Sequence, residues 1–332
     1  KEFIPSDRPY AIELNGIIIP RSDHLKTIIT ENAKIEIISA VGSRVTVFNI
    51  VKHTSVTLPF ESRALIKRMA MTPNGRLLLT IDEDGHSLCV DFAHRTVLYR
   101  FNFKKTPEAV EFSPNGKYFA IAVNGGGGPF AVLPLDKPCR YNTSQPIFNG
   151  HTGAVIDFDF HPFNDQIIAS CSDDQTVKLW EIPEGGLTEN ISDPLINLTG
   201  HHRRVIFLRF HPTAEGILAS AAKDNEIKIW DINSQSEIVN NTKTQDLIQD
   251  IVWDYCGKQY AVASKDKKVT AFDARTSEES FQFNPHEGSK GVKLAYLGNK
   301  DGWILIQPLL GISKTSLFKI IREYTEKIYS GF

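Results

Sequence analysis

The chain has 332 residues, of which 41% are hydrophobic and 23% are charged. These values are typical of a globular protein, so the chain can bury a large core, as two ordinary domains or as one large all-β domain. The formal net charge is −2. This value excludes a general attraction to nucleic acid or membranes, and any such contact would have to come from a local patch.

The four cysteines are Cys89, Cys139, Cys171 and Cys256, and none of them forms a CxxC pair. Because metal-ligand spacing is absent, we expect no metal site. Two of the thiols lie in apolar, strand-like runs, which is typical of buried free cysteines in a reducing compartment. No apolar run approaches the length of a membrane span, and the first residues contain no charged-then-apolar leader, so we expect neither feature.

A proline-containing turn recurs along the chain. Its four copies begin at Thr72, Ser113, His161 and His211, about 40 to 50 residues apart. Each copy precedes a β-rich run, a polar turn and a further strand, as in Gln166–Ser170, Ser172–Gln175 and Thr176–Trp180. Short strands that alternate with turn residues predict an all-β fold, and a period of this length is that of a β-propeller blade.

In chain order, six blades are predicted near residues 25–60, 64–103, 107–148, 150–198, 200–242 and 245–283. A seventh begins near His286 and supplies about two strands, 294–297 and 303–306. We expect residues 10–14 and 17–20 to complete this blade as a clasp that removes exposed edges. The prediction is a seven-bladed propeller over residues 1–310; a six-bladed ring with separately packed ends is the alternative.

Residues 311–332 have a different pattern. Over 313–329, apolar residues recur at spacings of three and four; they are Leu317, Ile320, Ile321, Tyr324 and Ile328. Charged residues occupy the other positions, and Ser313 is a suitable N-cap. The pattern predicts a C-terminal amphipathic helix, which either packs on the side of the propeller or binds a partner.

Two neighbouring blades contain the same polar set at the same spacing. Its members are His151, Ser170, Asp174 and Trp180 in one blade, and His201, Ser220, Asp224 and Trp230 in the next. These are the positions of the WD-repeat tetrad, a buried relay in which the aspartate accepts a hydrogen bond from histidine and the indole N–H finds a partner. The fold class is therefore predicted to be an all-β, seven-bladed WD-repeat β-propeller with a C-terminal amphipathic helix.

The His–Ser–Asp grouping is not interpreted as a hydrolase triad. A catalytic serine needs an exposed hydroxyl and an oxyanion hole, whereas a set that repeats and ends each time in tryptophan indicates architecture. Elsewhere the set is partial: Thr80 and Asp84 retain half of it, and Asp266 stands alone because Val262 replaces the serine. We expect no catalytic residue, no cofactor, no small-molecule substrate and no enzyme activity.

Residues about 119–298 resemble coronin, a family of actin-binding propellers. The phrases that carry the resemblance include Gly125-Gly-Gly-Gly-Pro-Phe-Ala-Val-Leu-Pro134, His161-Pro-Phe-Asn-Asp165 and Trp180-Glu-Ile-Pro-Glu-Gly-Gly-Leu187. The last phrase is specific, because generic WD repeats do not share it. The resemblance implies a scaffold that binds actin filaments and other proteins, in the cytoplasm at the cytoskeleton.

Residues about 38–118 resemble the first blades of the periodic tryptophan protein of the small-subunit processome. The matching phrases include Val41-Gly-Ser-Arg-Val-Thr-Val-Phe48, Leu58-Pro-Phe-Glu61 and Leu77-Leu-Leu-Thr-Ile-Asp-Glu-Asp-Gly85. This resemblance implies the alternative function, a nucleolar scaffold in small ribosomal subunit assembly with pre-ribosomal RNA and processome proteins as partners.

Two basic clusters are the candidate partner-binding sites. One consists of His202, Arg203 and Arg204, and the other of Arg63, Lys67 and Arg68. Either cluster could contact an acidic surface of actin or the phosphates of RNA, and either could be a solvated rim. Charge alone does not separate these partners.

Overall fold

The computed structural model describes residues 25–29, 35–49, 54–103, 105–123, 127–135, 145–284, 292–296, 303–308, 319–322 and 325–330. Every regular element in these residues is a β-strand, so the all-β prediction is confirmed. In the same residues, no helix is long and apolar enough to cross a membrane. The chain divides into two compact units, named here after their longest segments. The 57–210 unit also contains residues 40–46, and the 211–332 unit also contains residues 1–39 and 47–56.

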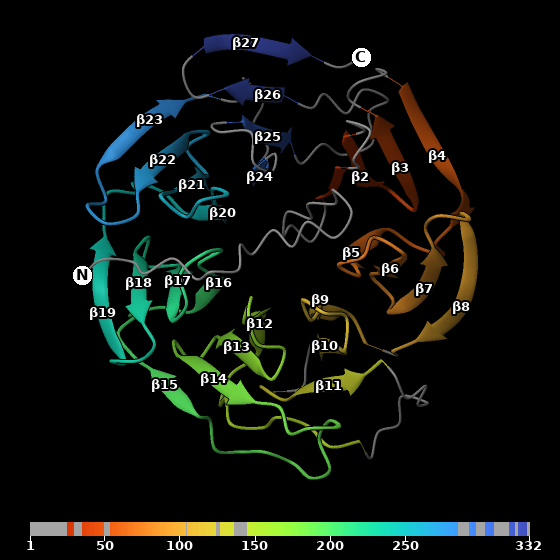
Figure 1. Ribbon diagram of the computed structural model, residues 1–332, viewed down its shortest axis with the longest axis horizontal. Coiled ribbons are helices and arrows are strands. Elements are labelled where there is room, and N and C mark those ends of the chain that lie inside the picture. The colour runs from red at the N-terminus through yellow and green to blue at the C-terminus, as the bar shows by residue number, and fades with distance from the viewer. Residues whose placement is uncertain are drawn as a thin grey trace. The chain divides into compact units, whose positions relative to one another are not determined.

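The 57–210 unit contains three antiparallel meanders. The first consists of β5 (Ile66–Met71), β6 (Leu77–Asp82), β7 (His86–Asp91) and β8 (Thr96–Asn102). The second consists of β9 (Pro107–Phe112), β10 (Tyr118–Val123) and β11 (Phe130–Pro134). The third consists of β12 (Val155–Phe160), β13 (Ile167–Ser172), β14 (Val177–Glu181) and β15 (Ile196–Leu198), and β16 (Val205–Phe210) follows it. In Figure 1 the three sheets lie one after another.

Apolar side chains hold neighbouring sheets of this unit together. The first strands of successive sheets are neighbours: β5 lies beside β9, β9 beside β12, and β12 beside β16. Between the second and third sheets, the rings of Phe130 and Phe148 stack with centroids 4.9 Å apart, and Trp180 meets Phe130 edge-on. Phe158 and Phe160 complete this buried cluster. Each sheet thus buries one face against the next, which is how propeller blades form a core.

The 211–332 unit is also built of antiparallel meanders. One series is β17 (Ile217–Ala222), β18 (Ile227–Asp231) and β19 (Ser236–Asn241). The next sheet is β20 (Ile248–Trp253), β21 (Gln259–Ser264), β22 (Val269–Asp273) and β23 (Glu279–Phe283). The last sheet is β24 (Val292–Tyr296), β25 (Trp303–Pro308), β26 (Lys319–Arg322) and β27 (Thr325–Ser330). β1 (Leu25–Ile29) pairs with β2 (Ile35–Val41), and β3 (Arg44–Asn49) and β4 (Thr54–Glu61) come next in the chain.

The predicted turns form at the expected places. In the Pro-Asn-Gly turns, Gly75 and Gly116 both have φ of 67°, and each N–H donates to the carbonyl three residues earlier at 2.8 Å. A glycine is suited to this left-handed conformation because it has no Cβ to clash with the backbone. The turns therefore reverse the chain from β5 to β6 and from β9 to β10.

The predicted C-terminal helix is not confirmed, because the part of this segment that the structure describes consists of strands β26 and β27. β26 pairs with β25, and β27 with β26. Isoleucine and threonine are β-branched, and Ile320, Ile321, Thr325 and Ile328 fit a strand at least as well as a helix. The edge of β25 that does not face β24 supplies backbone partners that a helix would not use.

The predicted clasp strands, 10–14 and 17–20, lie outside the described residues, so closure of the last blade by the N-terminal segment stays a prediction. The number of blades stays a prediction as well. The strands expected at 294–297 and 303–306 are present as β24 and β25.

Candidate functional site

The first polar tetrad forms a continuous hydrogen-bonded chain. The indole N–H of Trp180 donates to the hydroxyl of Ser170 at 2.8 Å, and Ser170 Oγ lies 2.8 Å from His151 Nε2. The other imidazole nitrogen of His151 lies 2.8 Å from Asp174 Oδ2. These contacts agree with a neutral imidazole that accepts from serine and donates to aspartate. The relay links the loop before β12 to strands β13 and β14.

Asp174 is the anchor of this relay. Burial raises the pKa of its carboxyl, but hydrogen bonds from His151 and Thr176 outweigh that effect and hold the pKa well below its usual range. The hydroxyl and the N–H of Thr176 both donate to Asp174 Oδ1, at 2.7 and 3.0 Å. The N–H of Thr152 donates to the other oxygen at 3.0 Å. A carboxylate with this many donors stays ionised and fixes the turn.

The geometry does not suit nucleophilic catalysis. Ser170 is fully buried, His151 is nearly so, and the serine oxygen already accepts a hydrogen bond from Trp180. A hydrolase serine must reach a substrate carbonyl, and this hydroxyl is enclosed by its own sheet. The structural interpretation of the first tetrad therefore agrees with its geometry.

The second tetrad shares the same serine–tryptophan contact. Trp230 Nε1 donates to Ser220 Oγ at 2.8 Å, and both side chains are buried. Asp224 Oδ1 accepts from the N–H of Glu226 at 3.0 Å, as Asp174 does from Thr176. His201 is buried in the 57–210 unit, whereas the other tetrad members, Ser220, Asp224 and Trp230, belong to the 211–332 unit.

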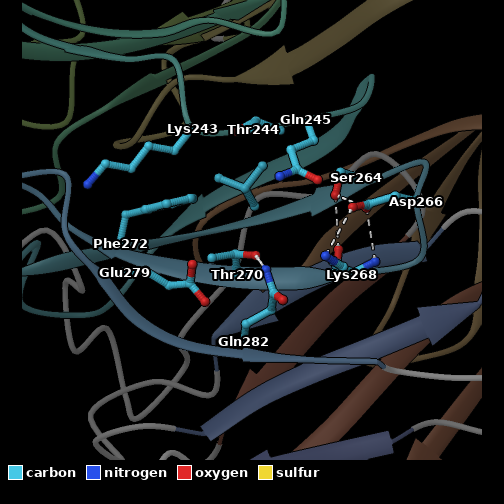
Figure 2. A pocket seen from close by; sticks show the side chains of 11 residues that line it. Lys243, Thr244, Gln245, Ser264, Asp266, Lys268, Thr270, Phe272, Glu279 and Gln282 are labelled. Atoms are coloured by element: carbon cyan, nitrogen blue, oxygen red, sulfur yellow. Dashed lines mark hydrogen bonds and ion pairs between the residues drawn. The ribbon is translucent and has the colours of Figure 1, made fainter.

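A pocket replaces the tetrad in the sheet of β20–β23. Lys243 stands as far before Asp266 as His151 stands before Asp174, and Val262 and Phe272 stand where serine and tryptophan stand in the tetrads. All four line an open pocket. Figure 2 shows these side chains, with Lys243 and Asp266 at opposite ends. The other lining residues are Thr244, Gln245, Ser264, Lys268, Thr270, Glu279 and Gln282.

The contacts in the pocket explain why no relay forms there. The ammonium group of Lys243 donates to the carbonyl of Ser277 at 2.7 Å, away from the turn. Asp266 Oδ1 instead accepts from the hydroxyl of Ser264 and, at 3.2 Å, from the N–H of Lys268. Asp266 and Val262 mark an incomplete tetrad in the sequence, but the pocket was not predicted; the lysine at the histidine position was the available signal.

Acidic residues connect the first strands of neighbouring sheets. In the 57–210 unit, Asp157 on β12 pairs with Arg209 on β16 at 2.5 Å and accepts from the N–H of Leu208 at 3.2 Å. In the 211–332 unit, Asp250 on β20 lies 3.6 Å from Lys293 and accepts from the N–H of Leu294 at 2.9 Å. Both aspartates sit at an irregularity in strand register. A bulge re-aims a side chain, here toward the neighbouring sheet.

The cluster of His202, Arg203 and Arg204 is exposed. Arg204 reaches Asp173 at 3.3 Å, and both side chains remain about two-fifths exposed. Such a pair contributes little to stability. The guanidinium of Arg203 stays accessible beside it, so this loop presents positive charge to solvent.

The three residues of the cluster Arg63, Lys67 and Arg68 differ in exposure and in their contacts. Lys67 and Arg68 are half-buried on β5, and both face Glu108 on β9, at 3.7 and 3.9 Å. Arg68 Nε also donates to the Glu108 carbonyl at 2.7 Å. These two residues join neighbouring sheets, and only Arg63 is exposed. Arg63 lies 3.4 Å from a ring nitrogen of His86.

Comparison with known protein families defines the class of fold. The family described as "WD domain, G-beta repeat" matches residues 142–181 and 192–231, the segments that hold the two tetrads. A family described as "Domain of unknown function (DUF1899)" matches residues 108–140. Together with the strand order and the first tetrad, the match to the WD repeat shows an all-β WD40 fold, the repeat from which β-propellers are built.

Within this class the chain resembles coronin. It is 46% identical over 219 residues to Coronin-A of Dictyostelium discoideum, which is 65% of this chain and 48% of the relative. A solved WD40 domain of Toxoplasma gondii coronin superposes with a TM-score of 0.59 at 26% identity, over 67% of this chain and 57% of that one. The predicted resemblance to coronin is confirmed.

The second resemblance is confirmed as well. The chain is 38% identical over 143 residues to the Periodic tryptophan protein 2 homolog of Dictyostelium discoideum. This match covers 43% of the chain but only 14% of the relative. The chain spans about half of Coronin-A and a much smaller part of the second relative.

Proposed function

We propose that the chain is a non-catalytic scaffold that binds actin filaments and other proteins at the cytoskeleton in the cytoplasm. The observation that carries the proposal is the similarity to Coronin-A, which extends over 65% of the chain at 46% identity. The relatives support a scaffold class, and the enclosed hydroxyl of Ser170 agrees with it.

The contact surface is proposed to be the basic loop at His202, Arg203 and Arg204. Its side chains are exposed, and the weak pair of Arg204 with Asp173 can be exchanged for a partner's carboxylate. Contacts between exposed charges are screened by salt, so binding through this loop falls as ionic strength rises. The half-buried pair Lys67 and Arg68 is a weaker candidate, because Glu108 already faces both.

Co-sedimentation with filamentous actin at low salt tests the proposal. The intact chain is expected to pellet with filaments, and Arg203→Glu is expected to weaken this binding about tenfold. Arg63→Glu tests the second cluster, and Lys265→Glu is the matched control, an exposed charge reversal outside both. Failure of the intact chain to pellet with filaments would refute the proposal; equal loss in all three variants would refute the assignment to this loop.

The second candidate function is a scaffold in small ribosomal subunit assembly. The identity of 38% to the Periodic tryptophan protein 2 homolog favours it. In this case the basic loop would contact RNA phosphates, and the protein would be nucleolar. Affinity capture from cells is expected to recover pre-ribosomal RNA and processome proteins. Recovery of actin without them would count against this function.

A further inference from the structure

The outer strand β8 exposes large apolar side chains. Tyr99 is 68% exposed, Leu98 46% and Phe101 39%. β8 is the last strand of its sheet, paired through its inner edge with β7, and the described residues supply no strand for its other edge. Figure 1 shows it as the long final strand of that sheet.

Another outer strand of the same protein serves as an internal comparison. β19 is likewise the last strand of its sheet, but its sequence is Ser-Glu-Ile-Val-Asn-Asn and none of its large apolar side chains is exposed. Proteins usually protect an exposed edge with charged side chains, proline or a short strand. β8 has seven residues and none of them is acidic or proline. The exposed residues of β8 are therefore not a general consequence of the outer position.

The surroundings of β8 are basic. Arg100 is exposed in the middle of the strand, and Arg95 is exposed in the turn before it. Asp91, which stands opposite Thr96 on the paired strand β7, already accepts from the N–H of His94 at 3.0 Å and lies 3.9 Å from Arg76. Among the described residues no strand pairs with this edge, so it offers backbone groups for pairing, apolar and aromatic contact area, and the positive charge of Arg95 and Arg100.

We propose that the edge of β8 binds an extended segment of a partner protein in which acidic residues alternate with apolar ones. The segment adds as a fifth strand: its backbone pairs with Leu98–Phe101, its apolar side chains cover Tyr99 and Phe101, and its carboxylates face Arg100. An extended protein segment is favoured over RNA because only a polypeptide can pair with the strand's N–H and C=O groups. This surface is separate from the loop at His202–Arg204.

A short synthetic peptide tests the inference. The probe has about seven residues in which glutamate alternates with valine and phenylalanine, and the control peptide has lysine in place of every glutamate. The intact chain is expected to bind the glutamate peptide and to bind the lysine peptide at least about tenfold more weakly. Tyr99→Ser and Arg100→Glu are each expected to weaken the glutamate peptide about tenfold, because aromatic and arginine anchors dominate such contacts. Arg203→Glu, an equally exposed change in the same unit, is expected to leave peptide binding unchanged.

Hydrogen exchange identifies the mode of binding. The peptide is expected to slow amide exchange in residues 96–102 and to leave 236–241, the β19 segment, unaffected. Four outcomes would overturn the proposal. They are no binding of the glutamate peptide, equal binding of both peptides, no slowing of amide exchange at β8, and binding of a second copy of the chain or of single-stranded RNA to β8 in place of the peptide. Self-association that Tyr99→Lys abolishes would identify the second copy.

Discussion

The hydroxyl of Ser170 accepts a hydrogen bond from the indole N–H of Trp180 and is also hydrogen-bonded to His151. One small side chain therefore satisfies two buried polar groups. Ser170→Ala leaves the indole N–H and an imidazole nitrogen without a partner inside the sheet. An orphaned buried polar group costs about 1–3 kcal/mol. We expect the free energy of unfolding in urea to fall by at least that amount. Ser192→Ala, at an exposed serine, is the control and is expected to change stability by less than about 0.5 kcal/mol.

His161 and His211 occupy equivalent positions at the ends of inner strands, and both accept backbone N–H bonds at Nδ1. Burial lowers the pKa of each imidazole to about 4 from 6.5. Between these values the unfolded chain binds protons that the folded chain does not, so protons favour unfolding there. Stability is therefore expected to be full above about pH 6.5 and to fall as the pH drops toward 4, by up to about 1.4 kcal/mol per pH unit for each histidine.

Urea unfolding at about pH 7.5 and about pH 5 measures this loss. His161→Asn removes one titrating group and is expected to flatten the dependence, whatever its effect on stability at neutral pH. An unchanged slope in this variant would show that His161 is not one of the groups responsible.

At the scale of the element, an ion pair between β12 and β16 holds neighbouring strands together. Asp157 and Arg209 are both nearly buried, and Asp157→Asn removes the negative charge that Asp157 places beside the guanidinium. Removing one partner of a buried pair typically costs about 3–5 kcal/mol. We expect a loss of this order, measured by denaturant unfolding. Glu61→Gln breaks the exposed pair with Arg44 and is expected to have little effect.

Substitutions in the pocket of the β20–β23 sheet are expected to change the free energy of unfolding in a non-additive way. Val262→Ser alone places a hydroxyl where no histidine or indole can reach it, and we expect a loss of about 1–3 kcal/mol. With Lys243→His and Phe272→Trp added, the hydroxyl gains both partners and the space is filled. The triple variant is expected to recover most of the loss, so the coupling energy from unfolding measurements is stabilising. Additive losses would show that the pocket is not a vacated tetrad site.

At the scale of the whole molecule, the two candidate binding surfaces lie in segments that resemble different families. The two surfaces therefore need not bind the same partner. The basic loop lies in the segment that matches the WD repeat, at 192–231. β8 lies in the part of the chain where the sequence resembles the periodic tryptophan protein. A scaffold with separate surfaces can hold two partners together, and the variants Arg203→Glu and Arg100→Glu distinguish them.

The sequence by itself determined the all-β class and the positions of the polar sets. The sequence was sufficient here because turn residues and the alternation of strands with turns are local features. The Gly-His, Ser, Asp and Trp positions also repeat at fixed spacing. The helix that the sequence favoured is not found at residues 319–322 and 325–330, where the same isoleucines fit a helix or a strand and pairing of β26 with β25 favours the strand.

Only the tertiary structure decided what the isolated residues do. Lys67 and Arg68 are basic in sequence, but a carboxylate from the next sheet faces both. Asp157 could have been a solvated residue, and a bulge directs it to Arg209 instead. Lys243, Val262 and Phe272 form a pocket wall only because the segment between β19 and β20 lies against strands β21 and β22. Contacts between sheets join residues far apart in the chain, and local patterns contain no information about which side chain will stand opposite.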